Sequence, residues 1–191
     1  LTFDAKNLFF ASDYHYGHAG IIQYCKRPYV SVDEMDQTLS FGLQETVPHK
    51  GVMVFLGDLT FHTDPTKIDA QIHSLRAETK ILVRGNHDGK EVAHSDKWDL
   101  VVDHLEIKVR FNGKTHRLFL SHYPHYSWPG SHHGGVHLHG HSHGQIPGYF
   151  VEKPNPQGLR NLVGGRLDIS ADCWDYRPVS FGQIWQRLEQ M

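Results

Sequence analysis

The chain has 191 residues, which is enough for one domain with a substantial hydrophobic core. A content of 39% hydrophobic and 21% charged residues excludes a disordered or fibrous protein, and no apolar run approaches the length of a membrane-spanning helix. The formal net charge of −2 excludes a general attraction to nucleic acids or acidic membranes, although it is compatible with a local basic pocket.

Predicted strands and helices alternate in the first half of the chain. Residues 8–12, 51–58 and 80–86 are short apolar runs typical of buried strands. Between them, helices are predicted to begin at Ser31, where the sequence SVDE is a capping box, and at Asp64, which precedes a proline. Apolar residues recur at helical spacing after both starts. This β-α-β-α-β order predicts a parallel sheet with right-handed crossovers.

The second half of the chain has a different pattern. Residues 100–123 alternate between apolar and polar side chains on both sides of Asn112-Gly113, which predicts a hairpin with a type I′ turn. Two further strands are predicted at residues 136–143 and 166–172, with a long loop at residues 144–165 between them. A helix is predicted at residues 180–190.

The sequence also bears on the cellular compartment. The start LTFDAKN lacks the charged-then-apolar order of a secretory signal. The two cysteines, Cys25 and Cys173, lie in unrelated contexts, which favours reduced thiols over a disulfide. We therefore expect a cytoplasmic protein.

Polar side chains that can bind metals follow five of the predicted strand segments. They are Asp13, His15 and His18 after the first, then Asp58, then Asn86 and His87, then His122, and finally His141 and His143. Open α/β sheets place their sites at such strand ends. Oxygen and nitrogen ligands without a thiolate suit Mn, Fe, Zn or Co and disfavour a structural zinc site. A cap or a turn explains each segment taken alone, but not all five in this order.

Taken in order, the segments SDYH, GD, GNHD, SHYP and GHSH resemble the calcineurin-like metallophosphoesterase superfamily. The resemblance spans Asp13 to His143. SDYHYGHAGIIQYCKRP and DCWDYRPVSFGQI are also similar to a subgroup of short bacterial and phage phosphoesterases. The resemblance implies a single domain over residues 1–191, with an α/β fold of two facing mixed β-sheets flanked by helices. The chain departs from many members after the second motif, where it has GDLTFH, so a supporting role for Thr60 or His62 stays open.

The resemblance further implies two divalent metal ions, with Mn²⁺ favoured and Fe, Zn, Co or Ni as alternatives. The residues implied for one ion are Asp13, His15 and His143, those for the other are Asn86, His122 and His141, and Asp58 would bridge the two. Two such ions about 3.5–4 Å apart can clamp a phosphoryl group and activate a water molecule. Because histidines two residues apart point to the same side of an extended segment, His141 and His143 can serve both ions.

Catalytic roles are implied for two residues. His87 matches the position that contacts the phosphate and assists the leaving group, and Asp88 matches its orienting partner. A general acid must not be a metal ligand, because a coordinated imidazole nitrogen cannot donate a proton.

Other residues are weaker candidates for substrate binding. His18 lies close to a predicted ligand, Arg27 and Arg84 could hold substrate charge, and the Gly/Pro-rich loop after His122 could form a pocket wall with Tyr123, Tyr126 and Trp128. Paired arginines and locally packed aromatic rings are the alternatives. We expect His139 either to support the metal ligands from behind or to pack in the strand, and we assign no role to His137.

The expected activity is hydrolysis of a phosphodiester, either a small-molecule diester or a cyclic nucleotide. The alternatives are a phosphomonoesterase, including the protein phosphatase type, and a non-catalytic scaffold, which the filled ligand positions disfavour. A nuclease is a further alternative, which the near-neutral charge disfavours. A dianionic monoester needs positive charge beyond the metals, and the motif loops carry few arginines. We expect a small phosphoester as partner, with no stable nucleic-acid binding and no membrane, while the oligomeric state is not indicated.

Overall fold

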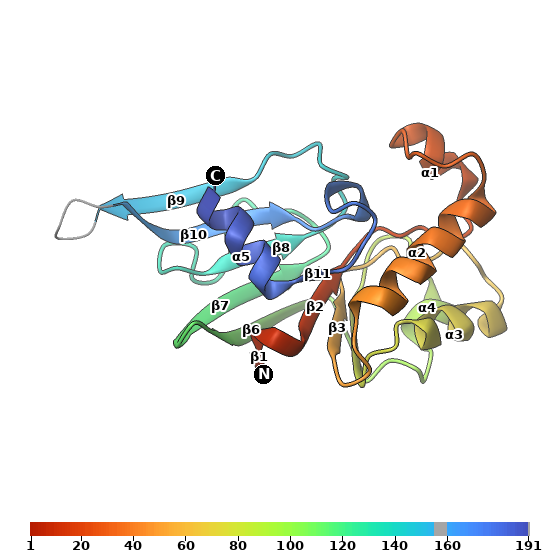
Figure 1. The fold of residues 1–191 in the computed structure, drawn as a ribbon, viewed down its shortest axis with the longest axis horizontal. Helices are drawn as coiled ribbons and strands as arrows, with labels where there is room; N and C mark the ends of the chain where they lie inside the picture. Colours follow the sequence, from red (N-terminus) through yellow and green to blue (C-terminus); the bar gives the residue numbers. More distant parts are fainter. Residues whose placement is uncertain (155–159, 191) are drawn as a thin grey trace.

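The computed structural model describes residues 1–154 and 160–190, and it contains two mixed β-sheets that pack face to face (Figure 1). The strands of the five-stranded sheet, in spatial order, are β11 (Val179–Ser180), β2 (Leu8–Ala11), β3 (Val52–Phe55), β4 (Thr79–Val83) and β5 (Leu100–Val102). The last four are parallel, and β11 is antiparallel to β2. The sequence therefore predicted β2, β3 and β4 correctly as parallel strands, but it missed β5, whose residues it included in the hairpin segment 100–123.

The second sheet has six strands. In spatial order they are β1 (Thr2–Asp4), β6 (His104–Phe111), β7 (Lys114–Ser121), β8 (Val136–His139), β10 (Arg160–Asp168) and β9 (Tyr149–Pro154). The strands β6 and β7 form the predicted hairpin, whose turn residues Asn112 and Gly113 have φ angles of 50° and 72°. Positive φ at both positions is what a type I′ turn requires.

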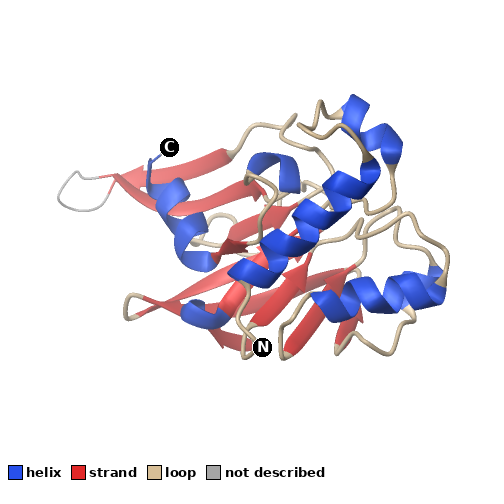
Figure 2. Cartoon of the chain, turned by 45° about the vertical axis from the view of Figure 1, so that its right-hand side comes forward, coloured by secondary structure: helices blue, strands red, loops and turns tan. Residues whose placement is uncertain are grey.

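Helices flank the two sheets (Figure 2). They are α1 (Ala19–Tyr24), α2 (Val32–Thr46), α3 (Pro65–Ser74), α4 (Lys90–Ala93) and α5 (Phe181–Gln190), with 3-10 turns η1 (Ala5–Asn7) and η2 (Ala171–Cys173). The predicted starts of α2 and α3 are confirmed, because Ser31 Oγ accepts from the Glu34 N–H at 3.2 Å and Asp64 Oδ1 accepts from the Thr66 N–H at 2.9 Å. Within the described residues, no helix is long and apolar enough to cross a membrane.

Two hydrophobic layers hold these elements together. On one face of the five-stranded sheet, Phe9, Met53 and Phe55 pack with Leu39 of α2 and with the other apolar residues of α2 and α3. The alternate strand residues point to the other face, where they form the core between the two sheets with Leu120 and its neighbours. This two-sided burial explains why β2, β3 and β4 are continuous apolar runs.

The prediction of a long loop at residues 144–165 is confirmed for residues 144–148 and wrong for residues 149–154 and 160–165. Residues 149–154 form β9, and β10 begins at Arg160 and not at Arg166, so the two strands pair antiparallel along the edge of the six-stranded sheet. Residues 155–159 lie outside the described part of the chain. Edge strands and bulges tolerate glycine and proline, and the register shifts between Leu162 and Gly164. The glycines and prolines therefore correctly indicated an irregular backbone, but they were wrongly interpreted as evidence that this segment contains no strands.

Candidate metal centre

The predicted ligands come together between the loops that follow five strands. Asp13, Asp58 and Asn86 follow β2, β3 and β4 of one sheet, and His122 and His141 follow β7 and β8 of the other. Three groups of three side chains have ligand atoms within 4.8 Å of one another. Two consist of predicted ligands, namely Asp13, His15 and His143, and Asp58, His122 and His141, and the third consists of Cys25, His143 and Asp172. The structure thus contains candidate metal-binding clusters made of the residues that the sequence singled out.

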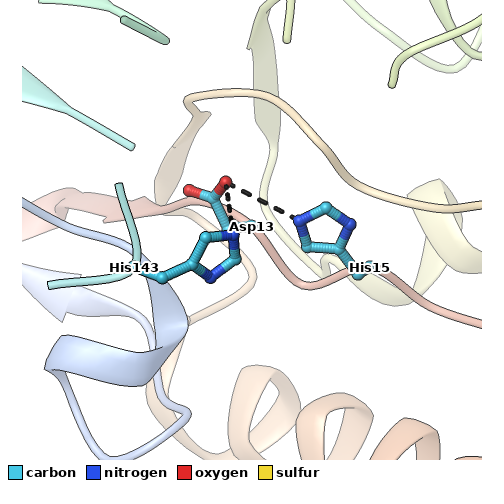
Figure 3. Close-up of side chains that lie close together, drawn as sticks. All are labelled: Asp13, His15 and His143. Carbon is cyan, nitrogen blue, oxygen red and sulfur yellow. Dashed lines mark ion pairs between the residues drawn. The ribbon is translucent and has the colours of Figure 1, made fainter. Parts of the chain in front are cut away.

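Asp13 is the centre of the first group (Figure 3). Its Oδ1 atom lies 3.8 Å from His15 Nε2 and 3.6 Å from His143 Nε2. These separations are too long for hydrogen bonds, but two ligands that each lie about 2.1 Å from one ion are roughly 3–3.5 Å apart. Both ring nitrogens of His15 are buried and have no hydrogen-bond partner among the described residues. Because unpaired buried polar atoms are rare, this donor set fits a bound cation.

Asp58 connects the first group to the second. Its Oδ2 atom lies 3.7 Å from His15 Nε2 and 3.5 Å from His122 Nε2, so one oxygen faces ligands of both groups. Its other oxygen accepts a 2.8 Å hydrogen bond from the His87 backbone N–H. Asn86 joins the second group, since its Oδ1 atom lies 3.0 Å from His122 Nε2.

Two of the predicted histidine ligands are oriented by contacts of the ring nitrogen that points away from the centre. His122 Nδ1 lies 2.7 Å from the Leu56 carbonyl oxygen, and His143 Nδ1 lies 2.7 Å from Asp172 Oδ2. When these Nδ1 atoms carry the proton and donate, the Nε2 lone pairs point towards Asp58 and Asp13, as metal binding requires. Asp13 Oδ2 accepts from Ser12 Oγ at 2.5 Å and from Ser170 Oγ at 3.0 Å. The His141 N–H lies 2.9 Å from Oδ2 and 3.1 Å from Oδ1, so Oδ1 accepts fewer hydrogen bonds than Oδ2.

The electrostatics of the site also favour a cation. Burial alone would lower the pKa of His122, but the hydrogen bond to Asp58 and the charges of Asp13 and Asp58 raise it to about 9. Burial likewise opposes the charged form of His143, yet Asp172 and Asp13 raise its pKa to about 10. Carboxylates that stabilise positive charge on nearby imidazoles would stabilise a divalent ion in the same place.

Five of the seven predicted ligands have a left-handed backbone. The φ angles are 58° for Asp13, 55° for His15, 58° for Asp58, 67° for His141 and 46° for His143. This conformation is unfavourable for residues other than glycine and is concentrated at functional sites, where the surrounding structure enforces it. The sequence analysis did not predict it, although aspartate and histidine are among the non-glycine residues that adopt positive φ most often.

Arg27 does not have the substrate-binding role considered from the sequence. Its side chain is buried, its Nε and Nη2 atoms lie 2.9 Å from the two carboxylate oxygens of Asp172, and it donates to the carbonyl oxygens of Asp13 at 2.7 Å and Tyr14 at 2.8 Å. It therefore holds Asp172, which in turn orients His143. Asp172 was missed as a functional candidate, although it lies in the segment DCWDY that supported the family resemblance.

Asp88 also has a different role from the one expected. Its carboxylate accepts hydrogen bonds from the backbone N–H groups of Asp58 at 2.9 Å, Leu59 at 3.0 Å and Gly85 at 2.8 Å. These contacts fix the loops after β3 and β4 and do not involve the His87 ring. The side chain that contacts the His87 ring closely is Phe61, at 4.7 Å between ring centroids, and sequence reasoning missed it.

The other substrate-binding candidates lie in different environments. Trp128 is only 5% exposed and donates from Nε1 to the Gly135 carbonyl oxygen at 3.0 Å, so it packs locally and forms no pocket wall. Tyr126 is 98% exposed, and Arg84 pairs with Asp103. Tyr123 remains next to the second group, with its ring centroid 4.8 Å from that of His141.

The two remaining histidines of the GGVHLHGHSHG segment are buried. His137 Nδ1 lies 3.0 Å from the Phe119 carbonyl oxygen, its Nε2 accepts from the His125 N–H at 3.1 Å, and burial lowers its pKa to about 3. His139 Nδ1 contacts the Gly140 carbonyl oxygen at 2.9 Å. Both side chains belong to β8 and lie on its face away from the core between the sheets.

Two proteins are similar to the chain in sequence, and no family model matches it. An uncharacterized protein of Methanocaldococcus jannaschii is 28% identical over 185 residues, which cover 97% of this chain and 93% of the relative. The gene 66 protein of Mycobacterium phage D29 is 29% identical over an alignment of 192 positions, which covers 88% of this chain and 89% of the relative.

Solved structures also match the chain, among them the following two. A protein of unknown function from Aquifex aeolicus has a TM-score of 0.63 and 21% identity, with 94% of this chain and 98% of that chain covered. The nuclease MPE of Pseudomonas putida has a TM-score of 0.43 and 17% identity over 87% of this chain and 79% of that chain, which is too low to assign an activity. The comparisons therefore show the two-sheet α/β fold alone.

Proposed function

We propose that the protein is a metal-dependent phosphoesterase with two divalent ions. One observation carries the proposal: a single oxygen of Asp58 faces His15 Nε2 at 3.7 Å and His122 Nε2 at 3.5 Å. Two adjacent cations repel each other and need a shared anion, and the Asp58 carboxylate could serve as that anion. Bound ions would supply charge for the phosphoryl oxygens and activate a water molecule.

Different residues of the chain would then bind the metals and donate the proton. The ligands for one ion are Asp13, His15 and His143, those for the other are Asn86, His122 and His141, and Asp58 serves both. In hydrolysis, water adds to phosphorus and one P–O ester bond breaks, which releases an alcohol and a phosphate ester with one substituent fewer. His87 is exposed and belongs to neither ligand group, so its ring can donate a proton to the departing oxygen.

Phosphodiesters are the favoured substrates, and Mn²⁺ is the favoured metal. A phosphomonoester carries two negative charges and needs cations beyond the metals, whereas both candidate arginines, Arg27 and Arg84, are paired with carboxylates. A protein phosphatase or another phosphomonoesterase is the second candidate, on the strength of the same ligand set. The expected partner is a small phosphoester.

Metal analysis followed by a substrate panel tests the proposal. The purified protein should contain or take up two divalent ions per chain, hydrolyse a bis-aryl phosphodiester with higher kcat/KM than the matched monoester, and lose activity with a chelator. A folded preparation that binds no Mn, Fe, Co, Ni or Zn would contradict the catalytic reading. A preference of about tenfold or more for monoesters across several leaving groups would favour the second candidate.

A further inference from the structure

The first ligand group has exposed aromatic side chains beside it. Phe61 is 37% exposed, and its ring centroid lies 5.4 Å from that of the ligand His15. The His18 ring stacks on Phe61, with centroids 4.0 Å apart and an interplanar angle of 16°. Tyr24 is 76% exposed, and its ring centroid lies 6.2 Å from that of His18. We call Phe61, His18 and Tyr24 the first aromatic group.

Tyr123 is in the equivalent position beside the second ligand group. It is 47% exposed, and its ring centroid lies 5.1 Å from that of His122 and 4.8 Å from that of His141. Among the aromatic rings of the described residues, the Tyr123 ring lies close to those of His122 and His141, whereas the Phe61 ring lies close to those of His15, His18 and His87. Each ligand group therefore has its own exposed aromatic surface.

Resting on the proposed function, we propose that the substrate is a linear phosphodiester that joins two planar aromatic groups, such as two nucleosides or two aryl alcohols. A phosphorus atom held between the two ligand groups has its two ester substituents leading away from it, and an aromatic surface lies beside each group. Stacking on such surfaces binds planar groups with little selectivity between them. A cyclic nucleotide carries one base and would use only one of the two surfaces.

The position of His87 gives the substrate a direction. Its ring lies 4.7 Å from Phe61, so the proposed proton donor is on the side of the first aromatic group. The leaving group is the part of the substrate that receives this proton. The departing alcohol therefore stacks against the first aromatic group, and the substituent that remains on phosphorus stacks against Tyr123.

Two diesters with the same leaving group test this assignment: phenyl 4-nitrophenyl phosphate and ethyl 4-nitrophenyl phosphate, each with the metal-loaded protein. The phenyl compound should have a KM roughly tenfold lower, because only its retained group can stack. Tyr123→Leu should reduce this preference towards unity. Tyr149→Leu removes another exposed tyrosine, which lies at the start of β9, and should keep the preference.

Phe61→Leu tests the other side of the substrate. It should raise KM for both diesters, since both carry 4-nitrophenol, and the loss for the phenyl compound should multiply with that of Tyr123→Leu in the double variant. Phe41→Leu, at an exposed phenylalanine of α2, is the control and should leave KM unchanged. A loss confined to kcat in Phe61→Leu would show that Phe61 only positions His87 and would overturn its part of the proposal.

Failure of this inference differs from failure of the proposed function. Equal KM values for the phenyl and ethyl compounds, or a higher kcat/KM for 3′,5′-cyclic AMP than for a dinucleoside monophosphate, would overturn the two-sided assignment while hydrolysis remained. Absence of chelator-sensitive hydrolysis of every diester would instead remove the phosphoesterase itself.

Discussion

Arg27 and Asp172 form a buried two-point ion pair, in which two guanidinium nitrogens each lie 2.9 Å from a carboxylate oxygen. Asp172 Oδ2 also lies 2.7 Å from His143 Nδ1, and Arg27 donates to the carbonyl oxygen of Asp13. One arginine thus supports two ligands of the first group, from loops that are far apart in sequence.

Asp172→Asn should therefore weaken metal binding without removing a ligand. The variant keeps the side-chain shape but has a weaker acceptor for His143 Nδ1, and such outer contacts are worth about 10–100-fold in metal affinity. Competition with a chromogenic chelator measures this change, and circular dichroism checks the fold. Asp175→Asn, at an exposed neighbour, is the control. Wild-type affinity in Asp172→Asn would show that the pair serves the fold alone.

Asp58→Asn should remove most of the bound metal. The amide is neutral, so two adjacent cations lose their shared anion, and the metal content should fall from two ions per chain to one or none. Elemental analysis of the purified variant measures this. Asp103→Asn, at a carboxylate that pairs with Arg84 away from both ligand groups, should retain two. Full occupancy in Asp58→Asn would contradict the bridging role.

His87→Ala should keep the metal and lose turnover. Removal of a general acid costs roughly 10²–10⁴-fold in rate, and the loss should be smaller for 4-nitrophenyl esters, since nitrophenolate hardly needs a proton. Steady-state kinetics with good and poor leaving groups, on protein of measured metal content, decide the point. Equal losses for both kinds of substrate would assign His87 to phosphate binding only.

Gly140→Ala should damage the centre without touching a ligand. A Cβ atom at this position would overlap Ser12 Oγ and Asp13 Oδ2, so Asp13 would have to move away from His15 and His143. The variant should lose metal affinity and activity together. At Gly182 the nearest heavy atoms to an added Cβ are 3.9 Å away, so Gly182→Ala is a matched control that should bind metal normally. Normal metal content in Gly140→Ala would show that the loop adapts.

Trp128→Ala should lower stability and leave KM unchanged. The side chain is buried and donates to the Gly135 carbonyl oxygen, and loss of a buried tryptophan typically costs about 3–5 kcal/mol of the free energy of unfolding. Denaturant titration and Michaelis–Menten kinetics below the transition measure the two effects separately. A raised KM with normal stability would return Trp128 to the substrate pocket.

The first three parallel strands, the hairpin and the seven ligand candidates could be predicted because all of them depend on local patterns. Apolar runs mark buried strands, and the polar residues that follow parallel strands meet at one edge of a sheet. The family resemblance then distributed the candidates between two ions, and the two ligand groups contain the same residues apart from Asn86, which joins the second through its contact with His122.

The supporting contacts could not be predicted because their partners are distant in sequence. Arg27 and Asp172 are separated by 145 positions, so nothing local distinguishes a paired arginine from one that binds substrate. Asp88 follows His87 directly, yet it bonds to the backbone of another loop. Phe61 was missed because a single phenylalanine after a strand carries no signal until folding brings the His87 ring to it.

The origin of the ligands in both sheets has a consequence for the order of assembly during synthesis. Asp13, Asp58 and Asn86 leave the ribosome early, with the four parallel strands of the five-stranded sheet, whereas His122 and His141 follow with the other sheet. A nascent chain that ends before residue 122 contains four of the seven proposed ligands, namely Asp13, His15, Asp58 and Asn86. If the protein binds two ions as proposed, its ligands come from both sheets, and bound metal would link one sheet to the other.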